Sequence, residues 1–164
     1  MRRLLRLTAA WILGIAGAAR ASVTGTAVEL KAADGTKLAA TYYSGDRPGP
    51  GILLLHQCNK DRSSWNGLAE SLARQGFHVL TMDYRGFGQS GGTPFLDLPP
   101  DRRTKNLTGG LWYGDVDVAY DYLRSQPGVR GVTGAGGASC GVNQSIQLAR
   151  RHPEVRSLVL LSGD

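Results

Sequence analysis

Hydrophobic positions near the start of the chain recur with a period of two. Residues 23–31 and 37–43 each alternate apolar and polar side chains, and the turn-forming pair Asp34-Gly35 lies between them. Such alternation is typical of a strand with one buried face, and a short turn between two strands predicts an antiparallel hairpin. Residues 52–55 are instead continuously apolar, which favours a central strand buried on both faces.

Three later segments show a helical period. Apolar residues recur at i, i+3, i+4 and i+7 over residues 65–73, 112–123 and 142–149. This spacing places the apolar side chains on one face of each helix. Short apolar or β-branched runs between these segments predict further strands, at residues 78–82, 132–133 and 157–161.

The order of these elements predicts the architecture. After the hairpin, strands alternate with helices, which is typical of a mostly parallel sheet with helices on both faces. Residues 93–110 carry three prolines and no clear period, and we expect a loop there that makes a surface excursion near the functional site. No internal repeat interrupts the pattern, and 164 residues suit one domain.

The first 21 residues look like a secretory signal peptide. A positively charged start is followed by the uncharged apolar run from Leu7 to Ala18, and Ala19-Arg20-Ala21 fits a small-x-small cleavage site. We therefore expect a domain over 22–164 that is periplasmic or secreted and keeps no stable membrane anchor after cleavage. The alternative is an uncleaved N-terminal anchor.

The charge of the chain adds little once the leader is set aside. The formal net charge is +6, but four arginines of the leader account for most of it, and about +2 remains. No basic run indicates a nucleic-acid partner. The two cysteines make no disulfide framework, and no spacing of His and Cys resembles a zinc site, so we expect neither a metal nor a cofactor. Nothing in the sequence indicates an oligomeric state.

Residues 137–141 read Gly-Ala-Ser-Cys-Gly, the G-x-S-x-G pattern of a nucleophile elbow. A strand is predicted before it and a helix after it, which is the context that this motif needs. A sharp turn between the two holds the serine in a strained conformation, and the glycines leave room for neighbouring backbone. The alternative is a glycine-rich turn in which Ser139 only caps the helix.

Three stretches together resemble the α/β-hydrolase superfamily, in particular its dienelactone hydrolase and serine-esterase branches. They are Leu-Leu-His-Gln at 54–57, Asp-Tyr-Arg-Gly-Phe-Gly-Gln-Ser at 83–90, and the elbow at 137–141. The resemblance implies a three-layer α/β/α hydrolase fold that carries the predicted hairpin at its N-terminus. It also implies that the C-terminal strands of that fold are missing from this chain.

The resemblance also implies a chemistry. Ser139 would be the nucleophile that forms a covalent acyl-enzyme with a small ester, lactone or similar acyl compound. Two backbone N–H groups would bind the oxyanion. One belongs to Cys140, and the other to the loop after the third strand, at Cys58 or, second, Gln57, which stands where the family usually has glycine. Cys140 is an alternative nucleophile, as in dienelactone hydrolases, but it stands one residue late.

If the N–H groups of Cys58 and Cys140 share one oxyanion, as the resemblance implies, their Cα atoms come within disulfide range. An oxidising compartment permits that bond. The alternative is two small side chains packed beneath the site.

A serine triad also needs a histidine and an acid, which this family places after the nucleophile. The resemblance makes His56 structural, while His78 starts a strand and His152 ends a helix, where we expect a surface residue. Asp164 is a weak candidate for the acid. We therefore expect a fragment of a larger secreted serine hydrolase. The alternative is a non-catalytic short form that binds an acyl ligand or a partner.

Overall fold

The computed structural model describes residues 23–162, so the expected signal peptide and Asp164 lie outside the described residues. Six strands form one sheet in the order β1-β2-β4-β3-β5-β6. Their bounds are β1 (Thr26–Lys31), β2 (Lys37–Tyr43), β3 (Gly49–Leu55), β4 (His78–Met82), β5 (Val129–Ala138) and β6 (Ser157–Leu161). The hairpin β1-β2 and the pair β2-β4 are antiparallel, whereas β3, β4, β5 and β6 run parallel, as predicted.

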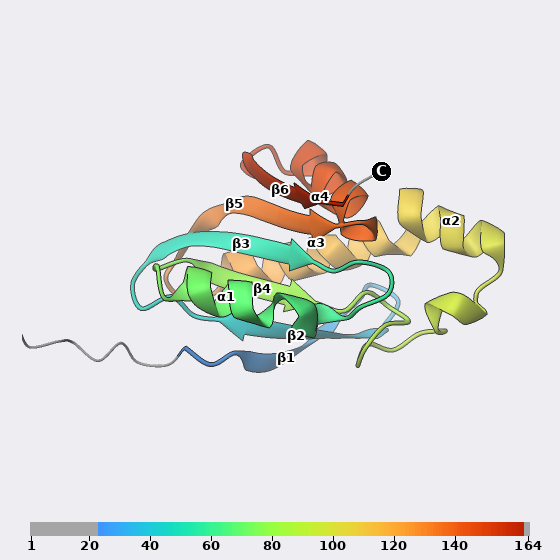
Figure 1. Cartoon of the computed structure of the whole chain (residues 1–164), viewed down its shortest axis with the longest axis horizontal. Helices are drawn as coiled ribbons and strands as arrows, with labels where there is room; N and C mark the ends of the chain where they lie inside the picture. Colours follow the sequence, from blue (N-terminus) through green and yellow to red (C-terminus); the bar gives the residue numbers. More distant parts are fainter. Residues whose placement is uncertain (1–22, 163–164) are drawn as a thin grey trace, which may run out of the picture.

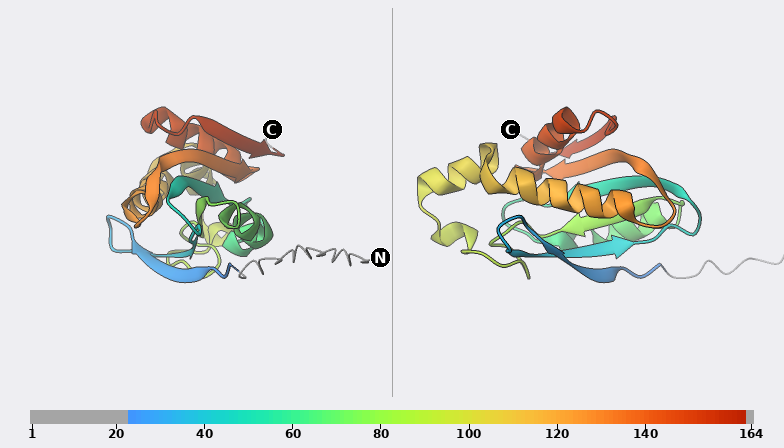
Figure 2. Two further views of the ribbon diagram at one scale, coloured as in Figure 1. Left: turned by 90° about the vertical axis from the view of Figure 1, so that its left-hand side faces the viewer. Right: turned by 180° about the vertical axis from the view of Figure 1, so that it is seen from behind.

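Helices cover both faces of this sheet (Figures 1 and 2). One face carries α1, and the other carries α3 with α4 beside it. The helices are α1 (Asn66–Ala73), α2 (Pro100–Thr108), α3 (Gly110–Ser125) and α4 (Cys140–Arg151), with short 3-10 turns η1 (Arg62–Trp65) and η2 (Phe95–Asp97). The architecture is thus three layers, α/β/α, around a mostly parallel sheet that begins with an antiparallel hairpin. Within residues 23–162, no helix has the length and apolarity that crossing a membrane requires.

The larger part of the core lies between the sheet and α3. Trp112 of α3 is fully buried and stacks on Tyr84, with ring centroids 4.4 Å apart and planes 6° apart. The period predicted for residues 112–123 is therefore the buried face of α3. The continuous apolar run in β3 is also explained, because its side chains pack against both layers of helices.

The expectation of a plain loop over residues 93–110 is wrong, because this stretch contains η2 and the nine-residue helix α2. Helix α2 buries none of its side chains, so no apolar period revealed it. Its prolines stand before and at its start, where a fixed φ suits a helix. The side chains of Asn143 and Gln144 donate to carbonyls near its end, at Leu107 and Asn106, and hold α2 against α4.

Strand β5 spans ten residues, far more than the two that the sequence indicated. Its second half is rich in glycine and therefore lacks the alternation that marks a strand. Gly136 shows why: a Cβ there would stand 2.7 Å from the Leu54 side chain of β3. The glycines let β5 lie between β3 and β6 directly before the elbow.

Candidate active site

The candidate site lies where the carboxyl ends of the parallel strands meet. In open α/β sheets, loops at this edge carry the functional groups. Ser139 follows the last residue of β5, and the loop from His56 to Asp61 follows β3, the neighbouring strand. The topology thus brings together two of the three stretches that the sequence analysis singled out.

Ser139 has a backbone conformation that few residues adopt. Its φ is 47° and its ψ is −113°, and its side chain is exposed. Positive φ in a non-glycine residue costs free energy and tends to mark functional turns. The Ser139 side chain makes no capping hydrogen bond to α4, so the alternative of a simple helix cap is wrong.

The two glycines of the elbow are required by close backbone approaches. A Cβ on Gly137 would lie 2.0 Å from the carbonyl oxygen of Gly141. A Cβ on Gly141 would lie 2.2 Å from the carbonyl oxygen of Leu55, the last residue of β3. The first turn of α4 therefore packs directly against the end of β3. This contact requires glycine at both positions, which explains the G-x-S-x-G spacing.

Cys58 and Cys140 form a disulfide, with their Cα atoms 5.6 Å apart. The alternative of two free thiols is therefore wrong, and so is Cys140 as a nucleophile in this state, because a disulfide sulfur is no thiolate. Within the described chain, the backbone N–H groups of Cys58, Cys140 and Gln57 have no hydrogen-bond acceptor. These are the three N–H groups expected at an oxyanion site.

Gln57 lies in the same turn as Cys58. Its carbonyl oxygen accepts from the Lys60 N–H, 3.1 Å away, and its side-chain amide donates to Asn59 at 2.6 Å. These bonds shape the turn where the family usually has a glycine. Cys58 and Gln57 both belong to this turn, which the disulfide to Cys140 holds next to the elbow.

His56 is fully buried at the end of β3, and both of its ring nitrogens are engaged. Nδ1 lies 2.8 Å from the Gln57 carbonyl oxygen, which only accepts, so Nδ1 carries the proton. Nε2 then accepts from the Tyr84 N–H at 3.3 Å. Burial lowers the pKa of His56, which keeps the ring neutral. His56 is therefore structural and leaves no nitrogen free for Ser139.

The other two histidines lie away from Ser139. His78 is buried at the start of β4, which is the opposite edge of the sheet, and its Nδ1 accepts from the Tyr42 hydroxyl at 2.6 Å. His152 follows α4, whose twelve residues separate it from Ser139 by about 18 Å of helix. The expectation of a surface residue there is only partly right. His152 is half-buried, because it stacks on Tyr120 and contacts Asp117 at 3.0 Å.

The stretch from Asp83 to Ser90 is the framework of the loop after β4. Asp83 is fully buried and accepts from the N–H groups of Arg62 and Gln89 at 2.7 and 2.9 Å, and from the Arg62 guanidinium. A Cβ on Gly88, whose φ is 49°, would stand 2.1 Å from the Asp83 carboxylate. The Ser90 hydroxyl donates to the Asp83 carbonyl at 2.7 Å. The motif that carries most of the family resemblance is thus structural.

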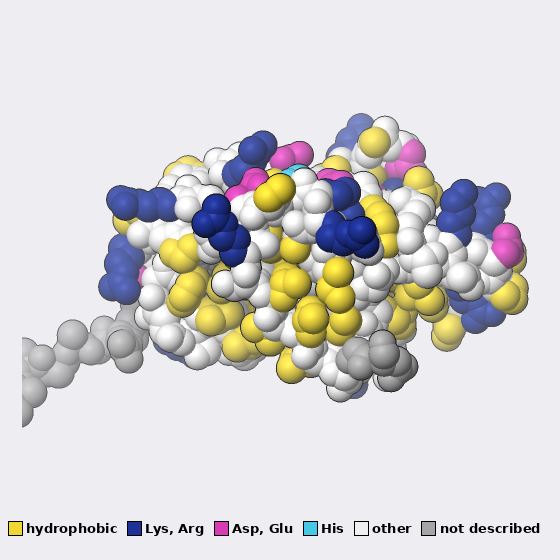
Figure 3. Space-filling model, turned by 90° about the horizontal axis from the view of Figure 1, so that it is seen from above, with side chains coloured by type: hydrophobic (Ala, Val, Ile, Leu, Met, Phe, Trp, Pro, Cys, Tyr) yellow, Lys and Arg dark blue, Asp and Glu magenta, His cyan; other side chains and the backbone are white. Residues whose placement is uncertain are grey.

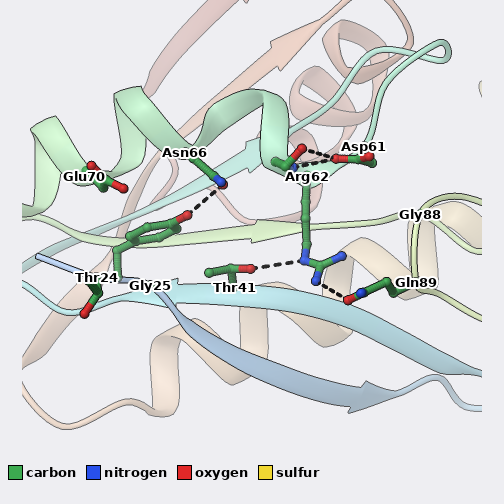
Figure 4. A pocket seen from close by; sticks show the side chains of 11 residues that line it. Thr24, Gly25, Thr41, Asp61, Arg62, Asn66, Glu70, Gly88 and Gln89 are labelled. Carbon is green, nitrogen blue, oxygen red and sulfur yellow. Dashed lines mark hydrogen bonds between the residues drawn. The ribbon is translucent and has the colours of Figure 1, made fainter.

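Sequence reasoning missed Arg62, the partner of that carboxylate. Its guanidinium donates to Thr41 at 3.1 Å and to Gln89 at 2.6 Å (Figure 4). A cavity of about 460 Å³ lies beside it, between the hairpin and α1, and Ser139 does not line it. Asp83 was the available signal in the sequence, because it directly follows the apolar strand β4. A carboxylate buried there needs a cation as its partner. Residues 23–162 hold no group of three His, Cys, Asp or Glu side chains suited to a metal ion.

Comparisons with solved structures show the same fold. The α/β hydrolase GrgF from Penicillium sp. sh18 matches with a TM-score of 0.70 and 19% identity, over 86% of this chain and 46% of that one. The esterase Pf2001 of Pyrococcus furiosus matches with a TM-score of 0.66 and 21% identity, over 87% of this chain and 52% of that one. At such identities the likeness establishes the fold alone.

Sequence comparison identifies a relative and a family. The thiohydrolase aneE of Aspergillus aculeatus is 30% identical over 105 residues, which cover 62% of this chain and 30% of that protein. The chain therefore spans less than a third of this relative and about half of the structures that it matches. The family model described as alpha/beta hydrolase fold matches residues 50–164, from β3 through the elbow and beyond. The chain belongs to the alpha/beta hydrolase fold family.

Proposed function

We propose that this chain carries the nucleophile and the oxyanion site of a serine hydrolase that cleaves an ester, lactone or similar acyl bond. The observation that carries the proposal is Ser139 itself, strained and exposed between β5 and α4. Within residues 23–162 the backbone N–H groups of Cys140, Cys58 and Gln57 have no acceptor, and the Cys58–Cys140 disulfide holds their turn next to the elbow. A strained serine next to free donors is the arrangement that acyl transfer needs.

The proposed reaction has two halves. The Ser139 oxygen attacks the acyl carbon, its proton passes to a base, and the carbonyl oxygen becomes an anion held by the N–H groups of Cys140 and of Cys58 or Gln57. Collapse of this intermediate expels the alcohol or thiol, which takes up the proton, and leaves an acyl-enzyme. Water then attacks the ester carbon and releases the acid and free Ser139.

The base and the acid of this reaction are expected outside the described residues. Within 23–162, His56 has no free nitrogen, while His78 and His152 lie away from Ser139. The matched part of this chain covers only 30% to 52% of the relatives that it matches, which supports a source in further sequence. Reading the gene past the codon for Asp164 tests this directly, and an immediate stop codon would contradict it.

The leaving group is proposed to be an alcohol or a thiol. The relative aneE is named a thiohydrolase, and Pf2001 is named an esterase. Matched acyl esters of p-nitrophenol and of thiophenol separate the two options. We expect turnover of both, because with an activated leaving group the attack of Ser139 on the acyl carbon limits the rate. The ratio of kcat/KM for the two esters then gives the preference for an oxygen or a sulfur leaving group.

The experiment that tests the proposal compares the full-length gene product with its Ser139→Ala variant. A fluorophosphonate probe should label the parent protein at one site, Ser139, and leave the variant unlabelled. Ester hydrolysis should fall at least about a thousandfold in the variant, since the covalent route is lost. Circular dichroism should show the same fold for both proteins. Retained hydrolysis by the folded variant would rule out Ser139 as the nucleophile.

A second function is a non-catalytic module that binds an acyl ligand or a partner. The observation that favours it is that none of the three histidines in residues 23–162 is placed to activate Ser139. This reading predicts no burst with an activated ester and no labelling by fluorophosphonate. Stoichiometric labelling of Ser139 would contradict it.

We also propose that the mature protein is periplasmic or secreted and that residues 1–21 are a signal peptide. The leader composition and the Cys58–Cys140 disulfide support this, because such bonds persist in oxidising compartments. N-terminal sequencing of the exported protein should begin at Ser22. Recovery of an intact Met1 in the cytosol would contradict the proposal.

A further inference from the structure

The disulfide joins the two backbone segments that the proposed oxyanion site needs. Cys140 is the first residue of α4 and directly follows Ser139. Cys58 lies in the turn after β3, 82 residues earlier in the sequence. Both side chains are half-buried, so the bond lies at the surface of the site and not deep in the core.

The two ends of this bond are held to very different degrees without it. The elbow is fixed by the close packing of Gly141 on the end of β3 and by the hydrogen bond from the Ser139 N–H to the Leu161 carbonyl at 2.9 Å. Among the described residues, the turn that carries Cys58 is held by the bond from the Lys60 N–H to Gln57, by the His56 Nδ1–H bond to the same carbonyl and by the Gln57–Asn59 side-chain bond, all within residues 56–60. A covalent link from this turn to α4 therefore restrains the less constrained of the two donors.

We propose that the Cys58–Cys140 disulfide is a positioning element of the oxyanion site. It holds the backbone N–H of the turn at a fixed separation from the N–H of Cys140, and turnover at Ser139 depends on the oxidised pair. The inference rests on the proposed serine-hydrolase function. Preorganised donors stabilise a transition state because they need not reorganise as charge develops. The cysteines themselves take no part in bond making, so they are positioning residues.

The test uses the full-length protein in its oxidised form and after reduction. Dithiothreitol supplies two electrons and two protons, which convert the disulfide to two thiols, and is itself oxidised to its cyclic disulfide. We expect kcat for an activated ester to fall about 10- to 100-fold, somewhat less than for complete loss of one donor, with KM unchanged. Affinity for a trifluoromethyl ketone, which forms an oxyanion on Ser139, should fall by the same factor. Reoxidation should restore both.

Three variants show whether the bond or the thiols matter. Cys58→Ser, Cys140→Ser and the double variant each remove the same bond, so they should lose the same factor in kcat. Losses that multiply in the double variant would overturn the proposal, as would full kcat after reduction. So would an effect on KM alone. Val132→Ala, a core variant at the far end of β5, serves as the stability control, because it should lower the melting temperature without changing kcat.

Labelling of Ser139 separates the two proposals. If the oxidised protein is neither labelled by fluorophosphonate nor active, the serine-hydrolase function fails, and this inference fails with it. If Ser139 is labelled and kcat is the same in the oxidised, reduced and variant proteins, the hydrolase function stands and only the role of the disulfide is refuted.

Discussion

Single residues at the elbow are chosen by backbone contacts. Ser139 keeps an unusual conformation because the segments on both sides of it are packed against β3 and β6. Neighbouring glycines allow this, since any side chain would meet a carbonyl oxygen. The strain is thus maintained by the surrounding fold, as is usual at functional turns.

Gly141→Ala should destabilise the protein by about 1–3 kcal/mol, because its Cβ would stand 2.2 Å from the Leu55 carbonyl oxygen and the backbone must move. Gly114→Ala is the matched control. It lies in the middle of α3 with nothing within 4 Å of the added Cβ, and should stabilise by about 0.5–1 kcal/mol. Urea unfolding measures both, and equal effects would contradict the packing argument.

His56 should make stability depend on pH between about 7 and 5. Burial lowers its pKa in the folded state below the ordinary value of about 6.5 that it regains on unfolding. Below pH 6.5 the unfolded chain therefore binds a proton that the folded chain does not, and the free energy of unfolding falls as the pH falls. Asp34 and Asp61 have lowered pKa values and act at lower pH, outside this window.

Chemical denaturation at several pH values tests this on His56→Gln. Between pH 7 and 5, the free energy of unfolding of the variant should fall less steeply than that of the parent, whatever the absolute stability of the variant. A parent slope retained by His56→Gln would show that another group titrates there.

At the scale of elements, a buried ion pair organises the loop after β4. Asp83 gathers the N–H groups of Arg62 and Gln89 and the Arg62 guanidinium, so one carboxylate ties η1 to this loop. Arg85 in the same loop ties it to Asp115 of α3 and to Asp34 of the hairpin turn, each at 2.6 Å. The loop is thereby fixed to elements on both sides of the sheet.

Asp83→Asn should cost about 3–5 kcal/mol, because it leaves the Arg62 guanidinium without its buried counter-charge. Glu29→Gln is the matched control. Its partner Lys37 lies 2.7 Å away, but both side chains are about two-thirds exposed, and such pairs contribute little. Denaturant midpoints measure the difference. A loss for Asp83→Asn as small as that for Glu29→Gln would refute the role of the pair.

For the molecule as a whole, the sheet ends in an exposed edge. Strand β6 pairs only with β5 among the described strands, and all five of its residues are exposed. Leu158, Val159, Leu160 and Leu161 expose between 37% and 54% of their surface. Figure 3 looks onto this end of the sheet, and hydrophobic side chains gather there. An apolar strand edge of this kind is a template for association.

The polypeptide 22–164 alone should therefore self-associate, and Val159→Lys should shift it toward the monomer by weakening association about tenfold. Burial of one such side chain contributes about 1.5 kcal/mol or more. Leu68→Lys is the control, because Leu68 is 41% exposed on α1, away from the edge. Sedimentation velocity measures the species present. Equal shifts for both variants would show general solubility effects, and a monomeric parent would contradict the prediction.

Much of this fold and part of the site were predicted from sequence, and the gaps have physical causes. Strands β1 and β2 and helices α1, α3 and α4 follow from their apolar periods, and strands β3, β4 and β6 follow from short apolar runs. Helix α2 escaped because it buries no side chain, and most of β5 escaped because its glycines carry no period. The elbow was predicted because its glycines and serine are adjacent in the chain. The ion pair of Asp83 with Arg62 was not predicted, because the two residues are 21 positions apart and no local pattern around Arg62 indicates a buried partner.

The order of the strands and of helices α1, α3 and α4, the position of Ser139 at a strand-to-helix turn, and the resemblance to the family could all be predicted from the amino-acid sequence. These depend on patterns within a few residues of one another. The folded chain was needed to show that Cys58 and Cys140 are bonded, that both nitrogens of His56 are occupied, and that Arg62 is the cation that neutralises Asp83. Each of these depends on groups that are distant in the chain and meet only when the sheet forms, because strand pairing and close packing set which side chains come within bonding distance.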